Sequence, residues 1–309
     1  MNILHKKNKN RWLFIVNSLA GRGKTGRILN ELIRELNALG FDYEIEVTKA
    51  PLHAIEITCE YVKKGFRKIV AVGGDGTVNE VVNGIMKSKK ADEIQFGVIP
   101  EGGGNDFARN LHLDSNIEKG LKVLLHGDTK EVDVGRIEDN YFINALGIGF
   151  DAEVAANSKA IRFLNGLPRY FLAIMKTLLK LKARNVQIEI NDEKFERSIL
   201  LMSIGNGISA GSGFLLTPNA IIDDGLYDIC IIRALPVFRI FKLLPTAIKG
   251  EHINYPEVEI KQASIIRIKS DYPIPVYYDG EIPVLKHPLE LKIELLQQKL
   301  QTFYRKLEK

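Results

Sequence analysis

The feature that most constrains the fold is a glycine-rich turn between an apolar run and a helical pattern. The turn reads Gly-Gly-Asp-Gly-Thr over residues 73–77 and follows the apolar run 69–72. After the turn, apolar residues over 78–86 recur at the i, i+3, i+4, i+7 spacing of a helix. Thr77 and Glu80 have the spacing of a capping box. We therefore predict a buried strand, a tight turn and a helix that Thr77 caps.

The same turn has the chemistry of a phosphate-binding site. Its glycines allow positive φ angles and the close approach of a ligand, and a helix N-terminus offers N–H groups and a positive dipole to an anion. Asp75 is the only acid in the turn, which makes it a candidate partner for a phosphate-bound metal ion. The alternative is a plain αβ connection in which Asp75 forms an Asx turn. Three glycines and a carboxylate exceed what such a turn requires, which favours the phosphate site.

Length and charge narrow the class of protein. A chain of 309 residues is long enough for two domains with sizeable cores. Its net charge of +5 suits anionic small molecules or an anionic membrane surface and does not argue for nucleic acid. Cys59 and Cys230 are the only cysteines and lack CxxC spacing, so we predict a reducing, cytoplasmic protein. Basic residues interrupt the most apolar region, 161–181, so any membrane contact should be peripheral.

Strands and helices alternate through the first third of the chain. The patterns predict strands over 12–16, 41–47, 69–72 and 94–100, and helices over 28–39, 52–64, 78–86 and 107–111. This alternation predicts a parallel sheet with helices on both faces. Glycine-containing turns follow three of the strands, at 17–26, 73–77 and 101–106. We expect all three turns along the carboxyl edge of the sheet, where ligands bind in such folds.

Two common nucleotide motifs are not met. Ser18 stands where the first glycine of a Walker A sequence belongs, upstream of Gly23-Lys24-Thr25. Asn79 stands where the third glycine of the Rossmann fingerprint belongs. The segment 17–26 is either a basic loop that faces a nucleotide or a solvated surface loop, and its residues do not decide between the two.

The pattern changes near Asp133. Before it, Ser115 and Glu118 predict a capped helix that ends at Gly127. From 129 onward, short alternating stretches predict a mainly antiparallel β domain. They lie at 131–136, 141–145, 186–190, 195–204, 226–232, 258–269 and 289–295. The last residues, 296–309, are polar and have a helical pattern.

Five motifs in order resemble those of the bacterial diacylglycerol-kinase-like lipid kinases, relatives of sphingosine and ceramide kinases. The motifs are Gly-Gly-Asp-Gly-Thr with Asn-Glu at 73–80, Pro-Glu-Gly-Gly-Gly-Asn-Asp-Phe-Ala-Arg at 100–109, Phe-Ile-Asn with Gly-Ile-Gly-Phe-Asp within 142–151, Asp-Asp-Gly-Leu at 223–226 and Asp-Gly-Glu at 279–281. The resemblance covers nearly the whole chain. NAD kinases and phosphofructokinases carry similar glycine-Asp-glycine turns, whereas Asn-Asp-Phe-Ala is typical of the lipid kinases.

The resemblance implies a fold in three parts. The first is an α/β nucleotide-binding domain over 10–133, with a parallel sheet like those of phosphofructokinase and NAD kinase. The second is a mainly antiparallel β-sandwich over 134–295 for the lipid substrate. The residue patterns predict these two parts without the resemblance. The third part, implied by the resemblance alone, is a C-terminal segment, 296–309, that packs back on the first domain.

The resemblance also implies a site for ATP and Mg²⁺ in the cleft between the domains. The residues expected at ATP are Asn17, Thr48, Gly73, Gly74, Asp75, Gly76, Thr77, Val78, Asn79 and Gly103. We expect Asp75 to contact the nucleotide-bound Mg²⁺. Glu281 matches the catalytic base, and Asp279 beside it could serve instead. A regulatory or structural Mg²⁺ is expected at Asp224 and at the main-chain carbonyls of Ile221 and Leu226.

The implied function is ATP-dependent phosphorylation of a lipid hydroxyl, with diacylglycerol converted to phosphatidic acid in phospholipid synthesis. The enzyme would act in the cytoplasm, in peripheral contact with the inner face of the membrane. No nucleic-acid partner is expected, and the resemblance leaves open whether the enzyme forms a homodimer. Gly103 stands where relatives carry Thr, and Ser18 where they carry Pro. The alternatives are an NAD-kinase-like enzyme or a lipid- or nucleotide-binding regulator without catalysis, which Gly103 motivates. Without the resemblance, residues 279–281 would predict an ordinary hairpin turn.

One segment carries apolar and basic residues mixed together. Its members are Phe163, Leu164, Leu167, Phe171, Ile174, Met175, Leu178 and Leu179, with Arg162, Arg169, Lys176, Lys180, Lys182 and Arg184. This mixture suits a segment at a membrane interface. It suits equally an amphipathic helix docked on the β domain.

Overall fold

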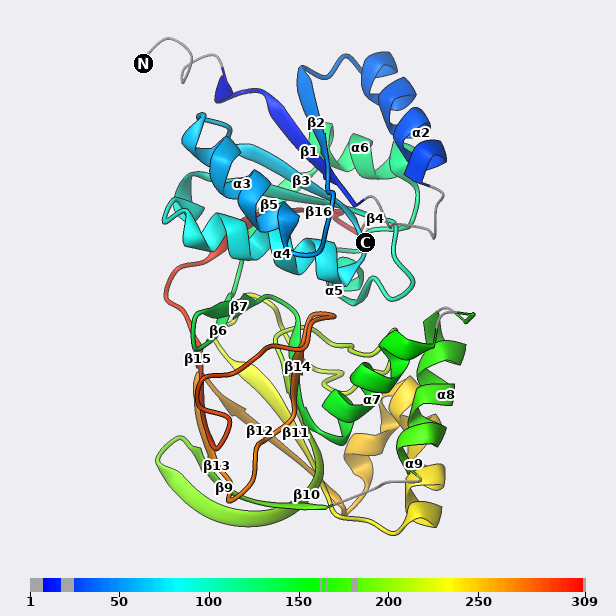
Figure 1. Cartoon of the computed structure of the whole chain (residues 1–309), viewed down its shortest axis with the longest axis vertical. Coiled ribbons are helices and arrows are strands. Elements are labelled where there is room, and N and C mark those ends of the chain that lie inside the picture. The colour runs from blue at the N-terminus through cyan, green and yellow to red at the C-terminus, as the bar shows by residue number, and fades with distance from the viewer. Residues whose placement is uncertain (1–7, 18–24, 162, 165, 179–182, 308–309) are drawn as a thin grey trace. The chain divides into compact units, whose positions relative to one another are not determined.

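The computed structural model describes residues 8–17, 25–161, 163–164, 166–178 and 183–307. The chain divides into two compact units (Figure 1). The first unit comprises residues 1–132 and 297–309, and the second comprises residues 133–296. Several residues singled out above lie outside the described ranges. They are Ser18, Gly23, Lys24, Arg162, Leu179, Lys180 and Lys182.

The first unit contains a six-stranded, mostly parallel sheet. Its order is β2 (Tyr43–Val47), β1 (Trp12–Val16), β3 (Lys68–Gly73), β4 (Gln95–Pro100), β16 (Leu300–Tyr304) and β5 (Asp128–Val132). Each neighbouring pair from β2 to β16 is parallel, and β5 runs antiparallel to β16. The predicted parallel sheet is therefore confirmed.

Helices cover both faces of this sheet. They are α2 (Thr25–Ala38), α3 (His53–Lys63), α4 (Asp75–Lys87), the short α5 (Asp106–Asn110) and α6 (Ile117–His126), with a 3₁₀ turn η1 at Ala91–Glu93. Apolar residues of α2 and α6 pack on the strand face that carries Phe14 and Val70. Leu13 and Ile69 alternate to the opposite face and are also fully buried. Helices α3 and α4 pack against each other on that side (Figure 1).

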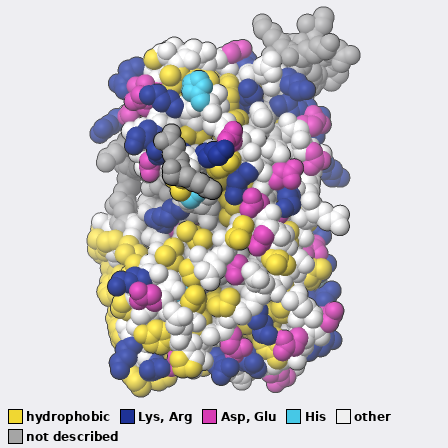
Figure 2. All heavy atoms as spheres, turned by 180° about the vertical axis from the view of Figure 1, so that it is seen from behind, with side chains coloured by type: hydrophobic (Ala, Val, Ile, Leu, Met, Phe, Trp, Pro, Cys, Tyr) yellow, Lys and Arg dark blue, Asp and Glu magenta, His cyan; other side chains and the backbone are white. Residues whose placement is uncertain are grey.

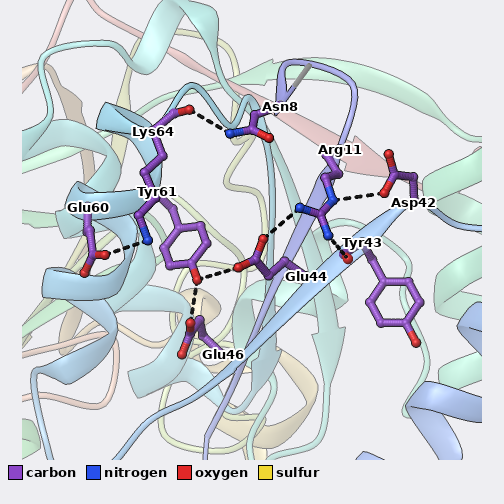
Figure 3. Close-up of polar contacts among 9 residues, drawn as sticks. All are labelled: Asn8, Arg11, Asp42, Tyr43, Glu44, Glu46, Glu60, Tyr61 and Lys64. Atoms are coloured by element: carbon purple, nitrogen blue, oxygen red, sulfur yellow. Dashed lines mark hydrogen bonds and ion pairs between the residues drawn. The ribbon is translucent and has the colours of Figure 1, made fainter. Parts of the chain in front are cut away.

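The edge strand β2 is held to α3 by a polar cluster (Figure 3). The Tyr61 hydroxyl donates to Glu44 Oε1 at 2.8 Å and to Glu46 Oε1 at 2.5 Å. Arg11 donates to Glu44 Oε2 at 3.0 Å and to Asp42 Oδ1 at 2.9 Å. Burial, followed by these two hydrogen bonds to carboxylates, raises the pKa of Tyr61. The charged side chains also protect an open sheet edge from pairing with other strands.

Residues 300–304 form a strand and the described residues 296–307 contain no helix, so the predicted helix over 296–309 is wrong. Strand β16 lies between β4 and β5 and pairs with both. Leu300 and Thr302 are fully buried there. The polar composition of this segment favours a helix locally, but pairing on both edges satisfies the backbone groups of a strand. Tertiary pairing therefore overrides local propensity.

The second unit is built from antiparallel strands. They are β6 (Gly135–Ile137), β7 (Asn140–Phe142), β8 (Ala145–Gly149), β9 (Arg184–Ile190), β10 (Glu193–Gly205), β11 (Tyr227–Arg233), β12 (Val258–Ala263), β13 (Ile265–Lys269), β14 (Val276–Tyr278) and β15 (Glu290–Leu295). The main sheet has the order β12-β11-β10-β9-β13-β15-β6-β7. The long strand β10 pairs with β9 over its first half and with β8 over its second half, and β8 also pairs with β14. The predicted antiparallel β domain is confirmed.

Three helices cover one side of this β domain. They are α7 (Phe150–Ala160), α8 (Gly166–Leu178) and α9 (Val237–Lys249), followed by a 3₁₀ turn η2 at Glu251–Asn254. They share an apolar cluster with strands β10 and β11, which includes Ala173, Cys230 and Leu243. Helix α9 was not predicted, although its apolar residues recur with helical spacing; Pro245 in its interior is the one local signal against a helix. Within the described residues, no helix combines the length and the hydropathy that crossing a membrane requires.

Candidate active site

The predicted glycine turn lies where β3 passes into α4. In the sheet register, Val16 faces Val72, and Gly73 faces Pro100. Strands β1, β3 and β4 therefore end at one edge, and the residues that follow them lie along it. The prediction that the three glycine-containing turns share this edge is confirmed for their described residues, because all three strands are parallel neighbours. Residues 18–24 of the first turn lie outside the described part of the chain.

The glycines of this site permit close packing and do not supply positive φ, contrary to the prediction. Among the described residues, the glycines with positive φ include none of Gly73, Gly74 and Gly76. A Cβ atom on Gly73 would lie 2.5 Å from Thr77 Oγ1. A Cβ atom on Gly102 would lie 2.4 Å from Gly74 Cα. The second and third turns thus touch through their backbones, which only glycine allows.

The capping box predicted for Thr77 and Glu80 is wrong. Helix α4 begins at Asp75, its N-cap is Gly74, and no side chain caps it. The Thr77 hydroxyl instead accepts a hydrogen bond from Asn17 Nδ2 at 2.8 Å. Glu80 Oε2 accepts from the backbone N–H of Ala54 at 3.1 Å, so it serves the first turn of α3. Contacts with β1 and α3, which are distant in sequence, outcompete the local cap.

Asp75 links the second and third turns. Its Oδ1 accepts from the backbone N–H of Phe107, at the start of α5, at 3.3 Å. The Glu101 N–H donates to the Gly73 carbonyl at 2.9 Å, which joins the same two turns. The Asn105 Oδ1 accepts from the Gly102 N–H at 3.0 Å, and Asn105 adopts φ 56°. This arrangement holds the first-turn N–H groups of α4 beside a second backbone turn, as a phosphate site requires.

The remaining predicted ATP residues differ in how exposed they are. Thr48 follows β2, and its N–H donates to the Val16 carbonyl at 2.9 Å. The side chains of Val78 and Asn79 are buried within the first unit. Gly103 is exposed at the tip of its turn. Val78 and Asn79 are thus enclosed in the first unit, and the Val78 N–H donates to the Gly74 carbonyl at 3.1 Å, whereas Gly103 is open to solvent.

Glu101 is a neighbour of this site that the sequence analysis did not single out. It directly follows Pro100, the last residue of β4. Burial, with a smaller contribution from the negative charge of Glu31, raises the pKa of the Glu101 carboxyl. A carboxyl that takes up a proton more readily repels a phosphate less. Glu101 stands inside the motif at 100–109, but the sequence does not reveal its burial or the approach of Glu31 from α2.

In the second unit, Asp279 and Gly280 form a tight turn between Tyr278 and Glu281. The N–H of each flanking residue donates to the carbonyl of the other, at 2.9 and 2.7 Å. Asp279 has φ 43° and Gly280 has φ 90°, and positive φ at both central residues is the pattern of a type I′ turn. The turn therefore has the hairpin geometry that the residues alone predict.

The Asp279 carboxylate is buried and fully engaged. Its oxygens accept from the backbone N–H groups of Ile143 at 2.7 Å, Asn144 at 3.1 Å and Ala145 at 2.9 Å. The Asp279 N–H also donates to the Ala145 carbonyl at 3.2 Å. Asp279 thus fastens the turn to the start of β8 and the residues before it, and the Phe-Ile-Asn motif supplies two of the three donors.

Glu281 is partly exposed, in contrast to the buried Asp279. Lys159, near the end of α7, places its Nζ 2.9 Å from Glu281 Oε2. The exposed fractions of the two side chains are 49% for Lys159 and 34% for Glu281, so both remain open to solvent. The sequence analysis did not identify Lys159, and a lone lysine 122 residues away carries no signal that could have done so.

The Asp223-Asp224-Gly225 loop offers oxygen donors to a metal ion. Asp224 is exposed, and its Oδ1 accepts from the Leu226 N–H at 3.0 Å. Burial, together with the charge of Asp224, raises the pKa of nearby Asp228. Within the described residues, no group of three or more His, Cys, Asp or Glu side chains could hold a metal. One carboxylate with the carbonyls of Ile221 and Leu226 is an all-oxygen set that suits Mg²⁺ when water completes it.

An apolar cavity lies inside the second unit. Its volume is about 70 Å³, and α7, α8, α9 and the sheet all contribute to its walls. The lining includes Phe150, Tyr170, Ile174, Leu201, Ile240 and Leu243. Asp151 is the charged residue in the lining. A cavity of this chemistry accepts hydrocarbon rather than a polar group.

Comparison with known families gives two matches that together span most of the chain. Residues 11–137 match the family described as the diacylglycerol kinase catalytic domain. Residues 144–301 match the family described as the YegS C-terminal NAD kinase beta sandwich-like domain. The first match covers the glycine turns, and the second covers the Asp279 turn and the apolar cavity.

Individual relatives agree with these matches. A diacylglycerol kinase of Staphylococcus carnosus is 31% identical over 274 residues, which are 88% of this chain and 89% of the relative. A diacylglycerol kinase of Staphylococcus aureus is 29% identical over 88% of this chain and 86% of the relative. A crystal structure described as a diacylglycerol kinase from Bacillus anthracis superposes with a TM-score of 0.77 at 30% identity. That superposition covers 96% of this chain and 97% of the solved one.

Proposed function

The chain belongs to the diacylglycerol kinase catalytic domain family, and from this premise we propose that it transfers the γ-phosphoryl group of ATP to the free hydroxyl of diacylglycerol. The products would be ADP and phosphatidic acid. The family is one of kinases, and the relatives named diacylglycerol kinase support the choice of acceptor at about 30% identity. The likeness to these relatives over most of the chain is the observation that carries the proposal.

In this proposal the first unit binds ATP. The N-terminus of α4 and the adjoining backbone of the third turn offer N–H groups to the phosphates. Positioning and charge stabilisation supply most of the catalysis in phosphoryl transfer, so a rigid backbone cradle suits the reaction. The contact between Gly74 and Gly102 supports such rigidity, because neither turn can shift without the other.

The second unit supplies the base in this proposal. The acceptor hydroxyl gives its proton to the Glu281 carboxylate while its oxygen forms a bond to the γ-phosphorus. The bond from that phosphorus to the bridging oxygen breaks, and ADP leaves with the electron pair. Glu281 is partly exposed, whereas the Asp279 carboxylate already accepts three backbone N–H groups. This difference supports Glu281 as the base and Asp279 as the residue that positions it.

Mg²⁺ belongs to the proposal as well. Bound between the phosphates and Asp75, the ion would neutralise charge on the transferred group. A second ion would stabilise the loop at Asp224 through the carboxylate and the carbonyls of Ile221 and Leu226. The oxygen donors at both positions suit this metal.

The apolar cavity supports a lipid acceptor over NAD by the chemistry of its walls and not by its size, because about 70 Å³ holds only a few methylene groups. The acyl chains of diacylglycerol require apolar walls, whereas a nicotinamide nucleotide requires hydrogen-bond donors and acceptors. Because diacylglycerol resides in bilayers and ATP in the cytoplasm, we propose that the enzyme contacts the inner membrane face peripherally and acts without nucleic acid.

The decisive experiment incubates the protein with radiolabelled ATP, Mg²⁺ and either short-chain diacylglycerol or NAD. We expect labelled phosphatidic acid and no labelled NADP. In Glu281→Gln, turnover should fall by about 10²- to 10⁴-fold while ATP still binds. Label in NADP would establish the NAD-kinase alternative. ATP binding without turnover of any lipid would establish the regulator.

A further inference from the structure

We propose that the outer faces of α8 and α9 form one docking surface for an anionic phospholipid bilayer. This inference deepens the proposed function, since it rests on a lipid acceptor, and it names the surface through which the enzyme would reach that acceptor. The α8–α9 surface comprises the exposed apolar residues Phe163, Phe171, Leu172, Phe238, Phe241 and Ile248 with the lysines Lys176, Lys242 and Lys249.

The apolar arc of helix α9 is wider than the fold needs, and only part of it is buried. Ile240, Leu243 and Ala247 are buried in the apolar cluster of the second unit. On the exposed part of the arc, Phe238 is 63% exposed and Phe241 is 43% exposed. A helix packed on a soluble domain normally turns polar residues to water. Two exposed aromatic rings one turn apart instead indicate an interaction surface.

Helix α8 repeats this arrangement. Tyr170, Ala173 and Ile174 are buried, whereas Phe171 and Leu172 are exposed. Phe163, just before the helix, is 73% exposed. One side of α8 therefore packs on the β domain, as expected for a docked amphipathic helix. The other side still exposes apolar and basic residues, as expected for a segment at a membrane interface.

The two helices belong to one local structure. Ile174 of α8 and Ile240 and Leu243 of α9 line the same apolar cavity. The inner residues of both helices thus line the cavity, and the exposed residues of both helices face away from it. Figure 2 shows hydrophobic side chains gathered along the lower left edge of the molecule, which is the side of α8 and α9 in Figure 1 turned by 180°.

The charge of the two helices selects an anionic partner. Helix α8 contains Arg169 and Lys176, helix α9 contains Arg239, Lys242 and Lys249, and neither helix contains Asp or Glu. Arg239 pairs with Glu257. Within the described part of the chain, no acid lies at ion-pair distance from the exposed lysines of the surface, which are Lys176, Lys242 and Lys249. Lysines beside exposed aromatic rings are typical of surfaces that bind anionic headgroups.

A second copy of this chain fits the surface less well. A two-fold contact brings the same patch of both copies together, so lysines would face lysines without an acid between them. An anionic bilayer instead offers negative headgroups to the lysines and an apolar interior to the rings. We therefore assign the bilayer as the occupant.

Sedimentation with vesicles tests the assignment. The full chain and Phe238→Ser/Phe241→Ser are mixed with phosphatidylglycerol or phosphatidylcholine vesicles, and the bound fraction is measured. We expect binding of the wild type to rise with phosphatidylglycerol and to weaken at least tenfold in the double variant. Tyr272→Ser is the matched control, because it removes a 72% exposed aromatic ring outside α8 and α9, and it should bind as the wild type does. Circular dichroism melting checks that each variant is folded.

Charge is tested separately with Lys242→Gln/Lys249→Gln. Each lysine removed should weaken binding to phosphatidylglycerol vesicles by about fivefold, with no change for phosphatidylcholine. Unchanged binding of both double variants would overturn the proposal. Sedimentation velocity without lipid adds a further check: loss of a dimer in Phe238→Ser/Phe241→Ser, with vesicle binding intact, would make the surface a contact between copies and likewise overturn it.

Activity separates this inference from the proposed function. On dispersed short-chain diacylglycerol, Phe238→Ser/Phe241→Ser should retain wild-type turnover, and on vesicle diacylglycerol it should lose turnover in proportion to binding. A wild type that binds vesicles but phosphorylates no diacylglycerol would refute the proposed function and leave the docking surface standing.

Discussion

Lys159 Nζ lies 2.9 Å from Glu281 Oε2, although the two residues are 122 positions apart in the chain. Helix α7 brings the ammonium group, and the tight turn at Asp279 presents the carboxylate. Both side chains are partly exposed, so the pair contributes little to stability. Its value in the proposed reaction is orientation, because it holds the candidate base in one direction.

Removal of the ammonium group should therefore impair turnover without impairing the fold. In Lys159→Ala we expect kcat to fall by about tenfold, as for a misplaced catalytic group, with KM for ATP unchanged. The melting temperature should stay within about 2 °C of the wild type, since a half-exposed ion pair contributes under about 1 kcal/mol. Lys159→Arg keeps the pair and should restore most of the rate. Equal rates for the alanine and arginine variants would contradict the positioning role.

Replacement of Asp279 should lower stability, whereas replacement of Glu281 should leave stability nearly unchanged. Asp279→Asn replaces a buried anion that accepts three backbone N–H groups, so the free energy of unfolding should fall by about 2–3 kcal/mol. Glu281→Gln changes a partly exposed side chain and should alter that free energy by under about 0.5 kcal/mol. Urea denaturation measures both values. A destabilised Glu281→Gln beside an unchanged Asp279→Asn would reverse the two roles.

Gly102 tests the contact between the two glycine turns. A Cβ atom at this position would lie 2.4 Å from Gly74 Cα, so Gly102→Ala must displace one of the turns. We expect a loss of about 1–3 kcal/mol of stability and ATP binding at least tenfold weaker by calorimetry. Gly120→Ala is the control. Gly120 lies inside α6, and a Cβ atom there would lie at an ordinary contact distance of 3.4 Å from the Ile99 side chain of β4. That variant should be neutral, or more stable by up to about 1 kcal/mol.

Gly103 tests the exposed tip of the third turn. This residue is not among the described glycines with positive φ, so a side chain can be accommodated there. Gly103→Thr adds a hydroxyl that can donate to a phosphate, and we expect KM for ATP to fall by about fivefold, equivalent to one hydrogen bond of about 1 kcal/mol. Gly103→Val has the same shape without the hydroxyl and should not lower KM. An equal gain in both variants would exclude the hydrogen bond as the cause.

His252 should make the second unit sensitive to acid. Burial lowers the pKa of its imidazole, and among the described residues its Nδ1 has no hydrogen-bond partner. The folded-state pKa lies below the unfolded value of about 6.5, so below that pH the unfolded chain binds the extra proton. Stability should therefore be lost as pH falls through 6.5, with a slope of at most about 1.4 kcal/mol per pH unit.

Denaturation of the wild type and of His252→Gln at pH 7.5, 6.5 and 5.5 checks this expectation. Glutamine retains a donor for the Leu216 carbonyl, which lies 3.2 Å from His252 Nε2. The variant should show a flatter dependence on pH over this range. An identical dependence in both proteins would remove His252 as the source.

The order of strands and helices in the first unit could be predicted because its signals are local. The run 69–72 and the helical spacing over 78–86 both appear as β3 and α4. The parallel arrangement follows from that alternation, and with it the shared edge of the three turns. Helix α9 was missed although its apolar residues recur with helical spacing, and Pro245 in its interior is the one local signal against a helix.

The partners of individual side chains could not be predicted in the same way. Thr77 and Glu80 have capping-box spacing, yet Asn17 and Ala54 bind them instead. The segment 296–309 has a helical composition, yet residues 300–304 form a strand because they pair with both β4 and β5. The predicted ATP contacts and metal ligands stay predictions until a bound complex is measured.

The sequence by itself determined the parallel α/β unit, the antiparallel β unit and the motifs of the lipid kinase family, because periodicity and glycine spacing act over a few residues. Only the tertiary structure decided which groups share a hydrogen bond. It assigned Asp279 to the backbone of Ile143, Asn144 and Ala145, and it placed Lys159 at Glu281. Such pairings depend on chain closure over more than 100 residues, and no local pattern records them.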